Sequence, residues 1–238
     1  METAPAGDAV RLAMEAFGTV VEIEVRDLPE DRTRQAIRDA MVELHRLSLL
    51  TSADAEVAGG AGRIEAAAGR EIEADPAYGE LLLSGLRYCI WSGGAHGPLG
   101  GRLYGLWGGA ERPDPYTLRE ALPTAACDRL EILSREPMRV RLAPQTILDT
   151  RGMERGFAAD LAVEVLQEHS VANAVVEVGS VVRALGPGPD GRGWPITVPG
   201  ASGSREILDE IYLHDQSLAV LSVPPGADER RPIDQRKG

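Results

Sequence analysis

The sequence predicts an α+β fold, in a single domain that spans residues 1–238. Strand and helix patterns are mixed along the chain, without the regular strand–helix–strand alternation of a dinucleotide-binding sheet. The chain of 238 residues is 43% hydrophobic, so it can bury one sizeable core. The sequence shows no internal repeat, low-complexity tract or interdomain linker.

Hydrophobic periodicity predicts the elements of the first half. Residues 19–26 alternate apolar and charged side chains, which is the period of a half-buried strand. Apolar residues recur at helical spacing from Asp31 to about Leu50 and predict a helix. Asp75-Pro76 supplies an N-cap and a first-turn proline. The helix that this pair opens is expected to end at Gly93-Gly94.

The second half is predicted to contain a hairpin, a helix and a meander. Residues 130–133 and 138–142 are expected to pair as a hairpin, and a β-type segment is expected to end at Leu148. A helix is predicted to start near Phe157 and to run to about Ser170, burying Leu161, Val165 and Leu166. Three short strands are expected to form one meander: residues 175–178, 181–185 and 195–198.

The turn from Asp149 to Gly156 suggests a ligand site. Gly152 lets backbone N–H groups come close to an oxygen-rich ligand, and a helix N-terminus adds unpaired donors and partial positive charge. Arg151 and Arg155 are permanent cations suited to phosphate. Diphosphate binding is one interpretation, and a strand–turn–helix corner with solvated arginines is the other. The glycine spacing matches neither the Walker loop nor the dinucleotide fingerprint.

Composition argues against several classes of function. The formal net charge of −12 disfavours nucleic acid and anionic lipid as partners. No apolar stretch reaches membrane-spanning length, and the first eight residues lack signal-peptide features, which predicts a cytoplasmic protein. Cys89 and Cys127 lie far apart without a CxxC motif, so they suggest neither a zinc site nor a redox dithiol. Cys89 is expected to be a small core residue.

Several short motifs, in order along the chain, resemble the ApbE family, the FAD:protein FMN transferases. Each stands where that family has a related motif: Phe17-Gly18-Thr19 for Met-Gly-Thr, Asp54-Ala55-Glu56-Val57 for Asp-Ser-Glu-Ile, the Ser92–Gly108 segment for Ser-Gly-Gly-Ala-Phe-Asp-Pro and Leu-Trp-Gly, the Asp149–Asp160 turn, Gly179-Ser180-Val181 for Gly-Gly-Asp, and Ile233-Asp234-Gln235-Arg236-Lys237-Gly238 for Ile-Asp-Pro-Arg-Thr-Gly. The resemblance implies an ApbE-like, T-fold-like arrangement of mixed antiparallel sheets with packed helices. It also implies that the C-terminal part of the family domain is missing from these residues.

The resemblance also implies FAD and Mg²⁺ as ligands. The positions that it matches to FAD contacts are Phe17, Thr51, Ala95, His96, Gly97, Asp149, Arg155 and Ile233. His96-Gly97 replaces a Phe-Asp pair, and Arg155 stands where a lysine is usual. The backbone near Gly152 is expected to face Mg²⁺, which prefers octahedral oxygen coordination. No residue is assigned as the catalytic base.

The implied reaction moves FMN from FAD to a threonine or serine hydroxyl of a target flavoprotein and releases AMP. Two alternatives are a non-catalytic FAD-binding paralogue and a structural partner of an active paralogue that binds no flavin. Residues 1–238 lack the family's histidine before Ile233 and its aspartate after Gly179-Ser180. We expect FAD to bind, because the Gly152–Gly156 turn with its two arginines is present. We expect no detectable flavinylated product, because the histidine and the aspartate are missing.

Overall fold

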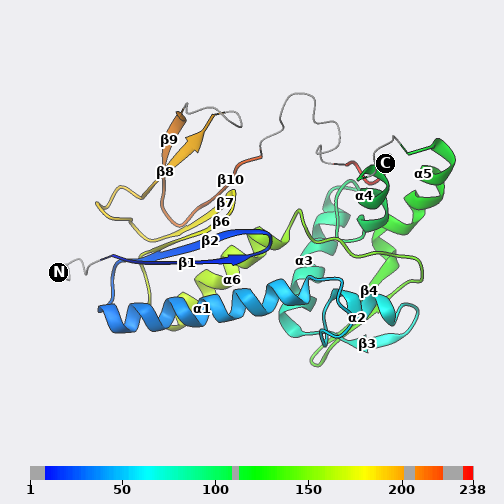
Figure 1. Ribbon diagram of the computed structural model, residues 1–238, viewed down its shortest axis with the longest axis horizontal. Coiled ribbons are helices and arrows are strands. Elements are labelled where there is room, and N and C mark those ends of the chain that lie inside the picture. The colour runs from blue at the N-terminus through cyan, green and yellow to red at the C-terminus, as the bar shows by residue number, and fades with distance from the viewer. Residues whose placement is uncertain (1–8, 109–112, 201–206, 222–232, 238) are drawn as a thin grey trace. The chain divides into compact units, whose positions relative to one another are not determined.

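The structure is a computed structural model that describes residues 9–108, 113–200, 207–221 and 233–237 (Figure 1). The chain divides into two compact units. Unit 1 comprises residues 1–46 and 155–225, and unit 2 comprises residues 47–154 and 226–238. The two units are described separately, and the organisation as a single domain stays a prediction. Within the described residues, no helix is both long and apolar enough to cross a membrane.

Unit 1 is built on a five-stranded antiparallel sheet. In spatial order its strands are β1 (Val10–Ala16), β2 (Thr19–Val25), β6 (Ala174–Val178), β7 (Val181–Leu185) and β10 (Ser217–Ala219). The strand predicted near residues 19–26 is confirmed as β2, and its apolar positions Val21, Ile23 and Val25 have no exposed surface. Alternation places these three side chains on one face, which becomes the core face of the sheet.

Two helices pack on the core face of this sheet (Figure 1). The predicted first helix is confirmed as α1 (Glu30–Leu50), which buries its apolar stripe at Ala36, Ile37, Ala40 and Leu44. The second is α6 (Glu154–Glu168), whose buried residues are Ala158, Ala159, Ala162, Val163 and Leu166. Of the three residues predicted to be buried, Leu161 and Val165 are only half-buried. The core face of α6 combines three alanines with Val163 and Leu166.

The opposite face of the sheet is covered by a separate two-stranded sheet, formed by β8 (Trp194–Pro199) and β9 (Ile207–Leu213). The expected single meander is therefore wrong for residues 195–198, because β10 and not β8 pairs with β7. Four glycines with positive φ, Gly186, Gly188, Gly191 and Gly193, turn the chain away between β7 and β8. Trp194 then covers the sheet, with its indole N–H donating to the Leu185 carbonyl at 3.1 Å.

Unit 2 combines a small sheet with short helices. Its strand order is β3 (Glu71–Glu73), β5 (Met138–Leu142) and β4 (Leu130–Arg135), which confirms the predicted β4–β5 hairpin. The helices are α2 (Ala61–Ala66), α3 (Pro76–Trp91), α4 (Gly101–Trp107) and α5 (Pro115–Ala121), followed by 3₁₀ turns at Leu122–Ala125 and Cys127–Arg129. As predicted, the Asp75 carboxylate caps α3, accepting the Ala77 N–H at 2.9 Å.

The expected β-type segment before Leu148 is wrong. Residues 143–150 form no strand, and the Leu148 N–H donates instead to the Glu65 carboxylate at 2.7 Å. Burial raises the pKa of Glu65, and this backbone hydrogen bond partly opposes the rise. A side chain from α2 thus replaces the strand partner that this backbone would otherwise need.

A disulfide joins Cys89, at the end of α3, to Cys127 in a 3₁₀ turn. Cys89 is fully buried, as expected of a core residue, but the sequence did not indicate that it is bonded. The two Cα atoms are 5.9 Å apart although 38 positions separate them along the chain. The pairing depends on tertiary structure that brings α3 and the 3₁₀ turn together.

The disulfide predicts a redox-dependent stability. Cys127→Ala is expected to lower the free energy of unfolding of the oxidised protein by about 2–4 kcal/mol, since the cross-link restricts the unfolded chain. Urea denaturation with and without a thiol reductant measures this. The reductant should shift the midpoint of the wild type and leave that of Cys127→Ala in place; equal midpoints for the wild type in both conditions would contradict the role given to the bond.

Candidate functional site

The turn before α6 is closed by an internal ion pair. Asp149, which is buried, accepts the Arg151 backbone N–H at 3.0 Å and both oxygens of its carboxylate bind the Arg151 guanidinium. Asp149 therefore forms an Asx turn, in which its carboxylate accepts the backbone N–H two residues further along. The hydrogen bond to Asp149 raises the pKa of Arg151. Arg151 also lies over the Tyr104 ring, 5.6 Å from its centroid. Its charge is thus already balanced within the turn.

His96 lies directly against Gly152. A Cβ atom built on Gly152 would be 2.8 Å from the His96 Cε1 atom, closer than real Cβ contacts. The loop that carries His96 is fixed at its start, because the Ser92 hydroxyl accepts the His96 backbone N–H at 3.1 Å. Glycine at position 152 is therefore required by the imidazole that packs on it.

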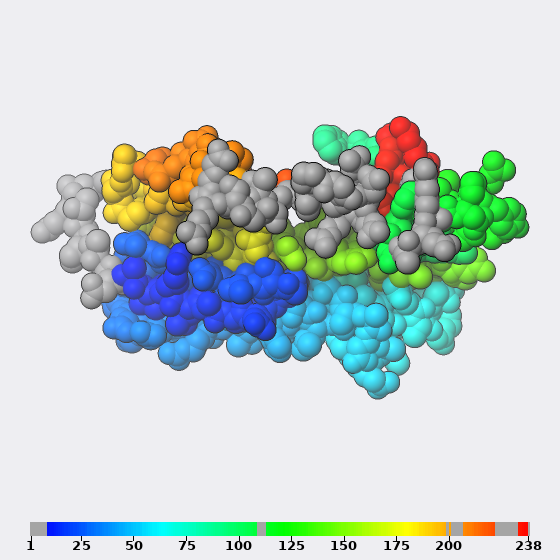
Figure 2. Space-filling view, turned by 45° about the horizontal axis from the view of Figure 1, so that its top comes forward, coloured from blue at the N-terminus to red at the C-terminus, as the bar shows by residue number. Residues whose placement is uncertain are grey.

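The C-terminal segment binds the same loop. The Gln235 backbone N–H donates to the Ala95 carbonyl, and its side-chain amide donates to the Gly97 carbonyl, both at 2.9 Å. Figure 2 shows this segment, in red, against the teal and green surface of unit 2. Six predicted site residues are thereby gathered in unit 2 by direct contacts or through immediate neighbours: Ala95, His96, Gly97, Asp149, Gly152 and Ile233.

Thr51 is placed at the C-terminal end of α1. Its hydroxyl donates back to the Ser48 carbonyl at 2.9 Å, so it is engaged with its own helix. The segment in which the family's histidine would be matched, Arg231-Pro232, lies outside the described residues.

Two predicted residues come together in unit 1. Phe17 has φ of +53° in the β1–β2 turn, and its carbonyl accepts a hydrogen bond from the Arg155 guanidinium at 3.3 Å. The same guanidinium lies beside Gly179, whose added Cβ would be 3.2 Å from Arg155 Nη1 and 2.7 Å from Thr19 Oγ1. Whereas Arg151 binds a carboxylate, Arg155 donates to a neutral carbonyl, so its charge is better placed to bind an anion.

Arg155 also lines a hollow of about 920 Å³ on unit 1, a volume in the range of small-molecule sites. One side is polar, with Thr19, Gly179 and Ser180 beside Arg155, and the other is apolar, with residues of β8 and β10. On the sheet floor, Arg11 lies 3.5 Å from Glu22 and 3.7 Å from Glu177. Burial raises the pKa of Glu177, and Arg11 opposes the rise. The hollow can therefore hold a ligand with both polar and apolar parts.

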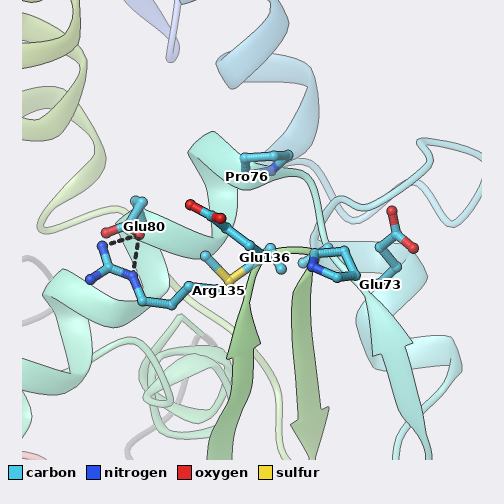
Figure 3. A pocket seen from close by; sticks show the side chains of 8 residues that line it. Glu73, Pro76, Glu80, Arg135 and Glu136 are labelled. Carbon is cyan, nitrogen blue, oxygen red and sulfur yellow. Dashed lines mark hydrogen bonds and ion pairs between the residues drawn. The ribbon is translucent and has the colours of Figure 1, made fainter.

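A second hollow, of about 760 Å³, lies on unit 2 between the start of α3 and the β4–β5 hairpin (Figure 3). It is lined by three carboxylates, Glu73, Glu80 and Glu136, and Arg135 binds Glu80 at its rim. None of the predicted site residues lines it. Its negative charge is unsuited to a diphosphate.

The described residues do not by themselves form a metal site. Among them there is no group of three or more His, Cys, Asp or Glu side chains arranged to hold an ion. Of the carboxylates close in sequence to Gly152, Asp149 is occupied by Arg151, and Glu154 accepts the Thr150 hydroxyl at 3.1 Å. The resemblance placed Mg²⁺ at the backbone near Gly152, and the side chains around that position do not complete an oxygen cage.

The contact between His96 and Gly152 predicts an unequal effect of two alanine substitutions. Gly152→Ala is expected to lower the free energy of unfolding by about 1–3 kcal/mol, because the new methyl group overlaps the imidazole. Gly156→Ala is the matched control: nothing lies within 4 Å of its Cβ position, and alanine favours the helix by about 0.5–1 kcal/mol. Thermal and urea unfolding measure both. Adding His96→Ala to Gly152→Ala should restore stability, and a failure to do so would assign the cost elsewhere.

Three known proteins with similar sequences share the same name. A chain from Haemophilus influenzae is 28% identical over 63% of this chain and 45% of its own length, and one from Treponema pallidum is 29% identical over 71% and 50%. One from Rhodobacter capsulatus is 30% identical over 77% and 36%. All three are named FAD:protein FMN transferase. The chain spans half or less of the length of these relatives.

Solved structures have the same fold. The ApbE protein of Thermotoga maritima superposes with a TM-score of 0.76, at 25% identity, over 88% of this chain and 69% of its own. The flavin transferase ApbE of Vibrio cholerae gives 0.76 at 18% identity, over 90% and 71%. These matches confirm the predicted mixture of helices and antiparallel sheets. The sequence model of the ApbE family matches residues 17–223, and the chain therefore belongs to the ApbE family.

Proposed function

We propose that the chain is an FAD-binding protein of the FMN transferase type, which holds FAD for transfer of FMN to a threonine or serine of a target flavoprotein. One observation carries the proposal. Three separate segments that match family motifs, residues 92–97, 149–152 and 233–235, meet around the His96–Gly152 contact and the Gln235 hydrogen bonds. The names of the relatives support the substrate, FAD.

The predicted FAD contacts in unit 1 differ in chemistry from those in unit 2. In unit 2, the predicted contacts lie in residues 95–97 and in the Asp149–Gly152 turn, which the contact between His96 and Gly152 brings together. In unit 1, Arg155 is the better candidate for a phosphate contact than Arg151, since Arg151 already binds Asp149. Phe17, whose carbonyl accepts a hydrogen bond from the Arg155 guanidinium, stays a predicted contact, as do Ile233 and Thr51.

The reaction is a displacement at phosphorus. The hydroxyl oxygen of the acceptor attacks the FMN phosphorus, the bond to the bridging oxygen breaks, AMP leaves with that oxygen, and the hydroxyl proton passes to a base that stays unassigned. A cation near the leaving phosphate would stabilise the charge that develops there, and Arg155 is suited to that role. The Mg²⁺ predicted from the resemblance stays a prediction.

A second function is favoured by a specific observation. Among the described residues there is no group of three or more His, Cys, Asp or Glu side chains that could hold a metal, which fits a non-catalytic protein that binds FAD without transferring FMN. A structural partner that binds no flavin is the third outcome. The acceptor flavoprotein itself stays a prediction.

The cellular location also stays a prediction. The sequence predicts the cytoplasm, whereas a disulfide such as Cys89–Cys127 persists mainly in oxidising compartments. Alkylation of thiols before cell lysis, followed by mass spectrometry, decides between them. Two free thiols would favour the cytoplasm, and an intact bond would favour export.

Binding and transfer can be tested together. When the purified chain is added to FAD, we expect the fluorescence of the flavin to be quenched or shifted. We also expect calorimetry to detect a heat of binding. With FAD, Mg²⁺ and a threonine-containing acceptor peptide, we expect no adduct from residues 1–238, because the sequence lacks the family's histidine before Ile233 and its aspartate after Gly179-Ser180. Mass spectrometry reads the peptide. A Mg²⁺-dependent FMN mass would establish transfer by this chain, and an absence of FAD binding would overturn the proposal.

The role of Arg155 has its own test. Arg155→Ala is expected to weaken FAD binding by about 1–3 kcal/mol, the cost of a lost charge-assisted hydrogen bond, and Arg155→Lys should recover much of it. Arg34→Ala is the matched control, since Arg34 pairs with Glu30 on the exposed side of α1. Equal FAD affinities for folded Arg155→Ala and Arg34→Ala would remove Arg155 from the site.

A further inference from the structure

We infer that Gln235 is a positioning residue that fixes the loop of residues 92–97 in the arrangement that receives flavin. The inference rests on the proposed function, because it is the resemblance that places Ala95, His96 and Gly97 beside FAD. It assigns a role to a side chain that the motif comparison leaves without one.

Gln235 binds both sides of His96. Its backbone N–H donates to the Ala95 carbonyl and its side-chain amide donates to the Gly97 carbonyl, each at 2.9 Å. Two hydrogen bonds from one residue to carbonyls two positions apart fix the orientation of the peptide units that flank His96. The direction of the imidazole toward Gly152 follows from that orientation.

Gln235 also reaches the turn that carries Asp149, through Tyr104. Gln235 and the Tyr104 ring meet at Gly100, where an added Cβ would be 2.4 Å from Gln235 Nε2 and 2.9 Å from Tyr104 Cε2. Burial and then the Asp149 carboxylate raise the pKa of Tyr104, and the Ile233 backbone and the Gln235 side chain oppose the rise. The Tyr104 ring in turn lies under the Arg151 guanidinium, which binds Asp149. One side chain therefore connects the two groups of predicted flavin contacts in unit 2.

The Gln235 side-chain amide is closely packed by its neighbours. Gln235 is 3% exposed. A Cβ on Gly100 would be 2.4 Å from the Gln235 Nε2 atom, although the backbone of Gly100 has an ordinary φ of −80°. Glycine at position 100 therefore leaves the space that the Gln235 side chain occupies. The family motif has proline at this position, and proline has neither the backbone N–H nor the side-chain amide to make these bonds.

The side-chain oxygen of Gln235 makes it possible to test the positioning role separately from an effect on stability. Among the described residues Oε1 is buried without a hydrogen-bond partner, which is costly for a folded protein. Methionine has nearly the same shape and no such oxygen. Gln235→Met should therefore lose the bond to Gly97 and at the same time lose an unsatisfied acceptor, so its melting temperature is expected to stay near that of the wild type.

The experiment compares Gln235→Met with Lys237→Ala, an exposed neighbour in the same turn. In the flavin-free protein, hydrogen exchange of residues 95–97 is expected to be faster in Gln235→Met and unchanged in Lys237→Ala. FAD affinity is expected to fall about tenfold in Gln235→Met, the equivalent of one lost buried hydrogen bond, and the visible spectrum of the bound flavin at saturation is expected to shift. Gly100→Ala keeps the glutamine but displaces its amide, and should reproduce both effects.

The outcomes are distinct. Unchanged exchange in Gln235→Met and Gly100→Ala would show that Gln235 does not position the loop. Faster exchange with unchanged FAD affinity and an unchanged flavin spectrum would show that Gln235 fixes the loop but that this does not affect flavin binding. A wild type that binds no FAD would overturn the proposed function, and with it the role of the loop as a flavin contact.

Discussion

The loop of residues 92–97 depends on Gly97, which is held from two directions inside unit 2. On one side lies Cys89: a Cβ on Gly97 would be 2.8 Å from the Cys89 Cβ and 2.9 Å from its Sγ. On the other side, the Gly97 carbonyl accepts the Gln235 amide. The disulfide to Cys127 fixes where Cys89 lies, and the loop then follows. The position of His96, and through it the requirement for glycine at position 152, is a consequence of this packing.

The charges of Arg151, in the turn before α6, and of Arg155, in the first turn of α6, are engaged differently. The chain carries a formal net charge of −12, so a cation that is to bind phosphate must not be fully engaged by a carboxylate. Arg151 binds Asp149 through both carboxylate oxygens and contacts Tyr104, whereas Arg155 is directed to a carbonyl in unit 1 and lines a hollow there. Two residues that look equivalent in the sequence thus have different chemistry. Asp149 makes the turn rigid, and Arg155 supplies the available charge.

The two units use small residues for different purposes. In unit 1, alanines on α6 let the helix approach the sheet, and glycines after β7 redirect the chain so that β8 covers the outer face. In unit 2, Gly97, Gly100 and Gly152 lie where a side chain would displace Cys89, Gln235 or His96. The absence of a side chain at these three positions is what lets separate segments of unit 2 contact one another. A single methyl group at any of them would disturb the contact between segments.

Local patterns in the sequence determined much of the fold. The strand at β2, the helix α1, the Asp75 cap of α3 and the β4–β5 hairpin follow from periodicity and capping, which act over a few residues. Short motifs in order also sufficed to place the chain in its family. Tertiary structure alone decided the Cys89–Cys127 pairing, the separation of β8 from the main sheet, the loss of a strand before Leu148 and the contacts of Gln235. Each of these depends on residues far apart in the chain whose proximity is set by packing, and no local pattern in the sequence records which distant partner will satisfy a given backbone group or fill a given space.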